Sequence, residues 1–173
     1  MRRSQIVTQV SGLLHGYAPT VTITIRPAVE ADLAALLALF AELHAEDPVL
    51  PSAHAAQIWR EIAAQPGRRV LLASLADAVV GTVDCAVLPN LTRGGRAFML
   101  VENVVVTAAA RRRGVGRRLL AAAVAVARAE GCYKVQLLSR SDRAEAHAFY
   151  EQCGFRSLAN GYRRYLDEPV FLT

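Results

Sequence analysis

The 173-residue sequence has few cysteines, few aromatic residues and no long apolar run, and each shortage excludes a class of protein. Its three cysteines, Cys85, Cys132 and Cys153, are odd in number and widely spaced. That spacing argues against a disulfide framework and a zinc site, and it favours a reducing, cytoplasmic compartment. No apolar run approaches the ~20 residues that span a membrane, and no signal-peptide core follows the charged start.

Aromatic residues make up only 6% of the chain, whereas arginine supplies almost all of its basic side chains. The net charge of +5 suits an anionic ligand, which by charge alone is either a small molecule or a nucleic acid. The arginines concentrate in one turn, and no aromatic residues alternate with them as a base-stacking surface requires. We therefore expect a small anionic ligand, with no nucleic acid and no membrane as partner. The alternative, nucleic-acid binding, predicts an affinity that falls steeply with salt.

The length and the apolar content of 53% predict a single folded domain over residues 21–173 with one buried core. Residues 1–20 precede it as an N-terminal arm whose apolar residues recur at helical spacing. This arm is compatible with a short amphipathic helix that packs on its own domain or on a second subunit. A membrane-contact helix and a wrongly assigned start codon stay open as alternatives.

The most informative stretch covers residues 101–120. It begins as a β-branched run, which predicts a strand, and it ends with apolar residues at the helical period. Between strand and helix lies a turn with three arginines and two glycines: Arg111, Arg112, Arg113, Gly114 and Gly116. Unpaired amides and the dipole at a helix start favour anions, glycines admit a ligand close to the main chain, and guanidinium groups bind phosphate oxygens. The turn therefore predicts a phosphate or diphosphate site.

Two common phosphate-binding motifs do not fit this turn. A P-loop needs a Lys-Ser/Thr pair after its last glycine, where this chain has Arg117 and Arg118. The dinucleotide fingerprint needs a third glycine at the position that Leu119 occupies. The alternative interpretation of this turn involves no ligand. The stretch would then be a solvent-exposed basic helix start whose glycines serve only the turn.

Two motifs in this chain instead resemble signatures of the GNAT superfamily of N-acetyltransferases. Arg111, Gly114 and Gly116 form R-x-x-G-x-G between a strand and a long helix, which is similar to that family's acetyl-CoA binding signature. Residues 146–155 match its second signature, A-x-x-F-Y-x-x-x-G-F. The resemblance spans about residues 21–166, with the two motifs in the expected order and spacing.

This resemblance implies an α/β fold in which helices cover both faces of a central, mostly antiparallel sheet that is splayed in the middle. The periodicity predicts strands at about 21–26, 70–75, 79–88, 97–106, 134–138 and 162–166, with a further strand starting at Phe155. Helices are expected at about 33–43, at 53–64, after the arginine turn and over 146–153. The strand–helix–strand unit after residue 97 implies parallel pairing through a right-handed crossover.

The resemblance also implies which residues hold acetyl-CoA, the expected cosubstrate. The main chain of Val104 and Val106 would pair with pantetheine amides, and an amide of Val104 or Val105 would polarise the thioester carbonyl. The diphosphate would be held by the residues of the turn: Arg111, Arg112, Arg113, Gly114, Val115, Gly116 and Arg117. The chemistry requires no metal.

Acetyl transfer requires a neutral amine, and a lysine-like amine of pKa ~10.4 is neutral in only about one molecule in 2,500 at pH 7. The resemblance implies Tyr150 as the general acid that protonates the departing thiolate. We assign Glu102 as general base, because a carboxylate within a β-branched central strand is costly to bury unpaired. A structural role, in which Glu102 is the buried partner of an arginine, is nearly as well supported. Asp84, His147 and a water chain are alternative sources of the base.

The acceptor is expected to be a small-molecule or peptide amine, which the sequence does not identify. By resemblance, the segment between the first two helices would help to form its pocket, with Glu46, Asp47, His54 and Trp59 as candidates. Dimers are common among folds of this kind, so a homodimer is open. The alternative function is a catalytically degenerate module of the same fold that keeps CoA as a sensor or structural ligand.

Overall fold

The computed structural model describes residues 22–166, which divide into two compact units at Leu137 and Leu138. The N-terminal arm predicted over residues 1–20 lies outside the described residues. Each unit is described by itself below. None of the helices in residues 22–166 combines the length and the apolar character needed to cross a bilayer.

The first unit contains a five-stranded sheet in the order β1-β2-β3-β4-β5. Strands β1 to β4 pair antiparallel, and β5 pairs parallel to β4, as the sequence predicted. The strands are β1 (Ile23–Pro27), β2 (Arg68–Leu75), β3 (Ala78–Leu88), β4 (Phe98–Val106) and β5 (Val135–Leu137). The predicted α/β class with a mostly antiparallel sheet is confirmed.

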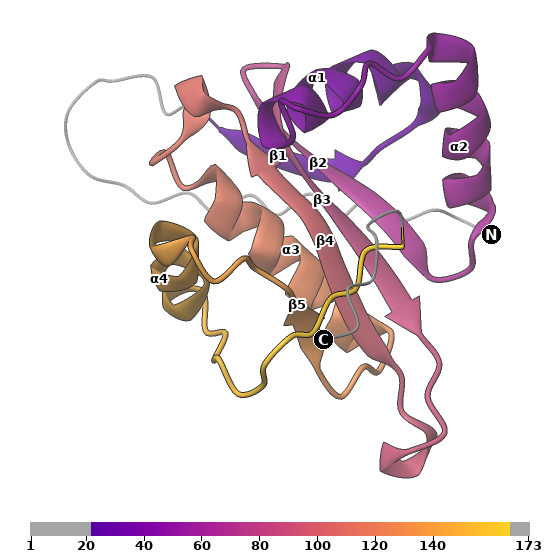
Figure 1. Cartoon of the computed structure of the whole chain (residues 1–173), viewed down its shortest axis with the longest axis vertical. Helices are drawn as coiled ribbons and strands as arrows, with labels where there is room; N and C mark the ends of the chain where they lie inside the picture. Colours follow the sequence, from indigo (N-terminus) through magenta and orange to yellow (C-terminus); the bar gives the residue numbers. More distant parts are fainter. Residues whose placement is uncertain (1–21, 167–173) are drawn as a thin grey trace. The chain divides into compact units, whose positions relative to one another are not determined.

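Helices cover both faces of this sheet (Figure 1). On one face α1 (Leu33–Leu43) and α2 (Ser52–Ala64) enclose an apolar cluster, while α3 (Val115–Ala129) packs against the other face. The buried stripe of α3 follows the helical period seen in the sequence: Val115, Leu119, Leu120, Ala123 and Ala127. Short 3-10 turns, η1 (Glu30–Asp32), η2 (Arg93–Gly95) and η3 (Ala108–Ala110), complete the unit.

A β-bulge interrupts the middle of β4. Thr82 pairs with Val105 and Asp84 pairs with Glu102, so one residue of β3 faces two residues of β4. Asn103, in the bulge, has a φ of 51°, a left-handed conformation that asparagine tolerates better than most residues. Pairing with β5 covers only residues 99–101 of β4. Beyond that point, β4 pairs with β3 alone among the described strands.

The second unit contains α4 (Ala144–Gln152), which the A-x-x-F-Y-x-x-x-G-F motif predicted. Gly154, which follows the C-cap residue Cys153, has a φ of 87°, and the Phe155 amide donates to the Tyr150 carbonyl at 3.0 Å. The strands predicted from Phe155 and over 162–166 are wrong, because these residues have no regular secondary structure. Tyr162 is 93% exposed and Leu166 is 88% exposed, and no described strand pairs with them. Strand propensity without a partner strand does not form a strand.

Candidate active site

The arginine turn joins β4 to α3, as the sequence predicted. Gly114 caps the helix with a φ of 81°, and Arg112 also has a positive φ, 58°. A Cβ added at Gly114 would meet no heavy atom within 4 Å, so the space in front of the turn is open. The main chain at this point is therefore accessible to a ligand.

The amides of this turn are available to an anion. The amide of Arg111 donates to the Ala108 carbonyl at 3.3 Å, and the amide of Arg118 donates to the Gly114 carbonyl at 3.1 Å. For the six residues between them, 112–117, the structure gives no hydrogen-bond acceptor within residues 22–166. Six consecutive N–H groups without an acceptor in the described part of the chain, at the positive end of a 15-residue helix, are an arrangement that favours anions.

The guanidinium groups around this turn are exposed. Arg111, Arg112, Arg113 and Arg117 all lie at the surface, whereas the Val115 side chain is 1% exposed and presents only its amide. The Nε of Arg111 donates to the Val106 carbonyl at 3.1 Å, which fixes that side chain against the end of β4.

Glu42, from α1, holds the chain just before the turn. Its carboxylate accepts from the Thr107 hydroxyl at 2.6 Å and from the Ala108 amide at 3.0 Å. These two hydrogen bonds, the first of them chiefly, together with the attraction of Arg111, lower the pKa of Glu42. The negative carboxylate therefore fixes the start of η3, the segment of chain that leads into the arginine turn.

The direction of the β4 amides beyond the bulge follows from one hydrogen bond. The Thr107 amide donates to the Val80 carbonyl at 2.9 Å, on the β3 side of the strand. Because successive residues of a strand alternate their amides between its two edges, Val105 also faces β3. Val104 and Val106 therefore face the opposite edge, where pairing with β5 has ended.

The two candidate bases lie opposite each other, in contrasting environments. Asp84 and Glu102 are directly paired across β3 and β4, so their side chains share the face covered by α1 and α2. Asp84 is 5% exposed, and its oxygens accept from Arg68 Nε at 3.1 Å and Nη2 at 2.6 Å. These hydrogen bonds raise the pKa of Arg68, against the opposing effect of burial. The expected burial of Glu102 is wrong, because Glu102 is exposed and the buried, arginine-bound carboxylate is Asp84.

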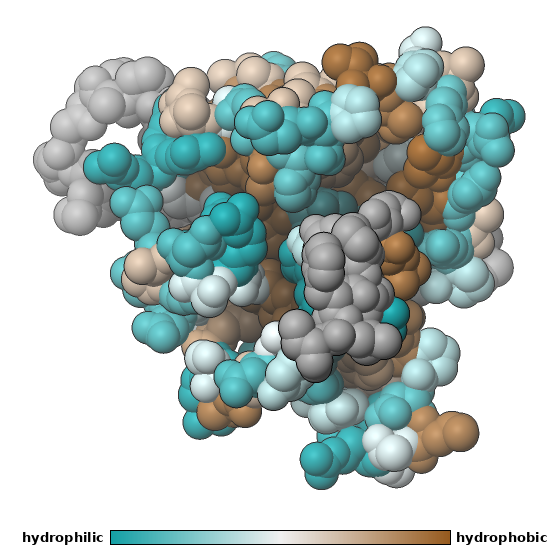
Figure 2. All heavy atoms as spheres, viewed as in Figure 1, coloured by the Kyte–Doolittle hydropathy of each residue, from teal (hydrophilic) through white to brown (hydrophobic). Residues whose placement is uncertain are grey.

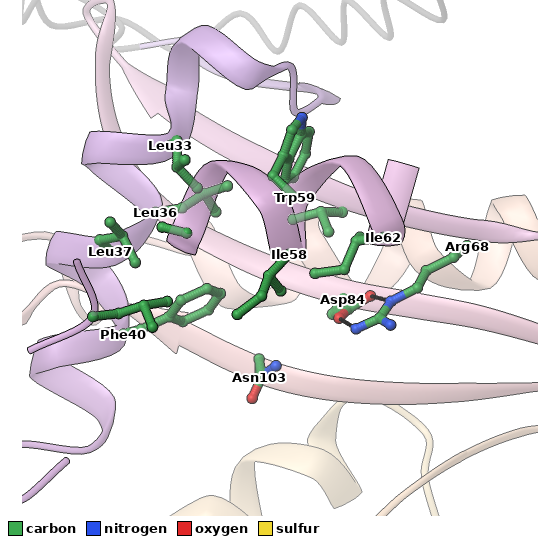
Figure 3. A pocket seen from close by; sticks show the side chains of 13 residues that line it. Leu33, Leu36, Leu37, Phe40, Ile58, Trp59, Ile62, Arg68, Asp84 and Asn103 are labelled. Atoms are coloured by element: carbon green, nitrogen blue, oxygen red, sulfur yellow. Dashed lines mark hydrogen bonds and ion pairs between the residues drawn. The ribbon is translucent and has the colours of Figure 1, made fainter. Parts of the chain in front are cut away.

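A pocket of about 110 Å³ opens on this face between α1, α2 and the sheet. Figure 3 shows apolar side chains of α1 at one end, the Arg68–Asp84 pair at the other and Asn103 between them. Figure 2 shows hydrophobic atoms within a hydrophilic border in the region of these two helices. The pocket lining consists of Leu33, Leu36, Leu37, Phe40, Leu50, Ala55, Ile58, Trp59, Ile62, Arg68, Val70, Asp84 and Asn103.

The pocket lies beside the two helices between which the sequence placed its acceptor candidates, but few of those candidates line it. Of the four candidates between the first two helices, only Trp59 lines the pocket, whereas Glu46, Asp47 and His54 are exposed. Two polar residues of the lining, Arg68 and Asn103, were missed. A signal existed for Asn103, since asparagine within a β-branched run favours a left-handed bulge.

Tyr150 belongs to the second unit, on α4. Its ring is half-buried and contacts Phe149 and Phe155, with ring centroids 5.4 and 6.1 Å away. His147, one turn earlier, has its Nε2 2.8 Å from the Arg140 carbonyl. That hydrogen bond to the main chain gives His147 a structural role and weakens it as a candidate base. Within residues 22–166, no group of three or more His, Cys, Asp or Glu side chains is placed to hold a metal ion.

Comparison with known proteins identifies the family. The model of the acetyltransferase (GNAT) family matches residues 34–155. A glucosamine 6-phosphate N-acetyltransferase of Trypanosoma brucei brucei is 33% identical over 139 residues, covering 79% of this chain and 91% of the relative. A crystal structure of a Trypanosoma brucei acetyltransferase is 31% identical, covering 84% of this chain and all of the other, with a TM-score of 0.73.

An aminoglycoside N-acetyltransferase in complex with CoA shares the fold, with a TM-score of 0.71 and 18% identity over 85% of this chain and 98% of the other. The family match covers most of the chain and includes both motifs that carry the resemblance. The chain belongs to the acetyltransferase (GNAT) family and is an acetyl-CoA-dependent N-acetyltransferase.

Proposed function

We propose that the turn between β4 and α3 binds the diphosphate of acetyl-CoA. The observation that carries this proposal is the run of amides at 112–117 without an acceptor among the described residues. Diphosphate oxygens are suitable acceptors for such a run, and the exposed arginines at 111–113 and 117 add charge-assisted hydrogen bonds. The pantetheine arm then pairs with the open edge of β4, where the main chain of Val104 and Val106 faces away from β3.

The same edge orients the acetyl group for attack. Either Val104 or Val105 was expected to donate its amide to the thioester carbonyl. Strand alternation favours Val104, because the Val105 amide faces β3. Since the Val106 carbonyl already accepts from Arg111, the amide of Val106 is the group that it offers to pantetheine. A donor aimed at the carbonyl oxygen stabilises the negative charge that develops there when the amine attacks.

Glu102 serves as the general base in this proposal and Tyr150 as the general acid. Glu102 is exposed beside the bulge, on the face of the acceptor pocket, and so suits the removal of a proton from an amine or an intervening water. Asp84 is less suitable, because each of its oxygens already accepts a hydrogen bond from Arg68. The Tyr150 phenol protonates the departing CoA thiolate.

The experiment that tests the cofactor site compares two glycines at opposite ends of α3. Gly114 and Gly131 both have positive φ, 81° and 69°, and neither has a heavy atom near an added Cβ. Both Gly114→Val and Gly131→Val should lower the melting temperature through backbone strain. Only Gly114→Val should raise the Kd for CoA, by about tenfold or more, because it distorts the anion site. Calorimetry measures this Kd. Equal CoA affinity in the two variants would remove the diphosphate from this turn.

The acceptor in this proposal is a small-molecule or peptide amine, and neither nucleic acid nor a membrane takes part. A cytoplasmic location is also proposed, supported by three cysteines that are all free within the described residues. The burial of Cys85 raises the pKa of its thiol to about 12, so that side chain behaves as an inert apolar residue. A homodimer stays a prediction, to be tested by light scattering.

A further inference from the structure

The chemistry of the pocket between α1, α2 and the sheet defines the class of acceptor, an inference that rests on the proposed function. We infer that the acceptor is a primary amine on a compact hydrocarbon body, such as a branched alkylamine or an arylalkylamine. This class differs from the amino-sugar phosphate for which several of the chain's relatives are named.

The lining of the pocket selects an apolar body. Ten of its thirteen residues are apolar, and α1 and α2 contribute most of them, including Leu37, Phe40 and Ile58. An apolar cavity of about 150 Å³ accommodates a benzene molecule, so a pocket of about 110 Å³ with an open mouth suits a group of isobutyl to phenyl size. The hydroxyl groups of a sugar would find few hydrogen-bond partners here, and each one left unpaired costs affinity.

The polar end of the pocket selects a cation. The Asp84 carboxylate accepts one hydrogen bond at each oxygen, and a carboxylate has about four acceptor positions, so it can also accept from an ammonium group. Arg68 balances the charge of Asp84, and Glu102 directly across the strands adds one negative charge. The side-chain oxygen of Asn103, between the two ends, is a further acceptor.

This lining offers a phosphate group a single cationic partner, whose charge Asp84 already balances. Among the described residues that form the pocket, Arg68 is the one cationic side chain. Three of its five N–H donors are engaged, since Nε and Nη2 donate to Asp84 and Nη1 donates to the Gln65 side chain at 2.9 Å. A phosphate placed at this end of the pocket would be repelled by the Glu102 carboxylate, and the attraction of Arg68 for it would be offset by Asp84.

The test measures thiol release from acetyl-CoA by the full-length protein with four amines: phenethylamine, isoamylamine, methylamine and glucosamine 6-phosphate. We expect kcat/KM for phenethylamine and isoamylamine to exceed that for the other two by about tenfold or more, since hydrocarbon groups in a fitted pocket discriminate to that extent. CoA binding is measured separately by calorimetry. If CoA does not bind, the proposed function fails; if CoA binds but glucosamine 6-phosphate is preferred, or no amine is acetylated, only the present inference is overturned.

A pair of tryptophan variants on α1 locates the selectivity in the pocket. Leu37 is half-buried and lines the pocket, whereas the adjacent Ala38 is exposed. Leu37→Trp should lower kcat/KM for phenethylamine by about tenfold while that for methylamine changes little, because the added ring occupies the space of the hydrocarbon body. Ala38→Trp should match the wild type with both amines. An equal loss for both amines in Leu37→Trp would mean that the pocket does not hold the amine's body.

Discussion

At the scale of single residues, the site depends on two carboxylates that the same strand pairing places side by side but that differ in environment. Asp84 is buried and engaged by Arg68, so its negative charge is balanced within the protein. Glu102 is exposed at the bulge and can exchange protons with a substrate or with water. Environment, and not residue type, therefore separates the structural role of Asp84 from the catalytic role proposed for Glu102.

Glu102→Gln should reveal this division in the pH dependence of the rate. A general base acts in its deprotonated form, so the wild-type kcat/KM should fall toward acidic pH as the base becomes protonated. The Gln variant should lose about a hundredfold or more in its plateau rate and should no longer show that acid limb. Glu61→Gln, at an exposed position of α2, is the control and should retain the wild-type profile. An unchanged acid limb in Glu102→Gln would assign the base to another group.

At the scale of elements, the Arg68–Asp84 pair fixes β2 to β3 at the floor of the pocket. Arg68→Met should lower the free energy of unfolding by about 2–3 kcal/mol, because it leaves a carboxylate buried without its partner. Arg69→Met, which breaks a surface ion pair with Glu130 from the adjacent position, should cost less than about 1 kcal/mol. Urea denaturation at pH 7 measures both.

A second substitution makes this prediction specific to the pair. Adding Asp84→Leu to Arg68→Met removes the orphaned charge and should recover most of the loss, since paired apolar residues replace buried ion pairs at little cost. Equal destabilisation by Arg68→Met and Arg69→Met, or no recovery in the double variant, would show that Asp84 does not depend on Arg68.

The sequence predicts some elements better than others. The difference is whether an element is determined by its own local pattern or needs hydrogen bonds to a partner strand elsewhere in the chain. The order of strand, turn and helix around residues 101–120 was predicted, though not the bulge at Asn103 or η3, because β-branched residues, glycines and helical periodicity all indicate the same local structure. The C-terminal strands were wrong because a strand also needs a partner, which local pattern does not reveal. The exposure of Glu102 was missed for a related reason, since it depends on what covers the sheet face at the bulge.

At the scale of the whole molecule, the division into two units separates the proposed binding residues from the proposed acid. The first unit carries the arginine turn, the open edge of β4 and the two carboxylates, and the second carries α4 with Tyr150. Both motifs of the sequence were needed to predict the function, and they fall one in each unit. Substitution of the proposed acid should therefore lower turnover without weakening cofactor binding.

Tyr150→Phe should lower kcat by about a hundredfold while the Kd for CoA stays within about twofold of the wild type, because only the phenolic hydroxyl is removed. The aromatic ring is kept, so the contacts with Phe149 and Phe155 are preserved and the fold of α4 should not change. Tyr162→Phe, at a position 93% exposed, is the matched control and should leave both quantities unchanged. Stopped-flow or steady-state thiol release gives kcat, and calorimetry gives the Kd. Wild-type turnover in Tyr150→Phe would exclude the phenol as proton donor. The CoA thiolate would then depart without acid assistance. Its pKa, close to the ~8.5 of a cysteine thiol, permits this.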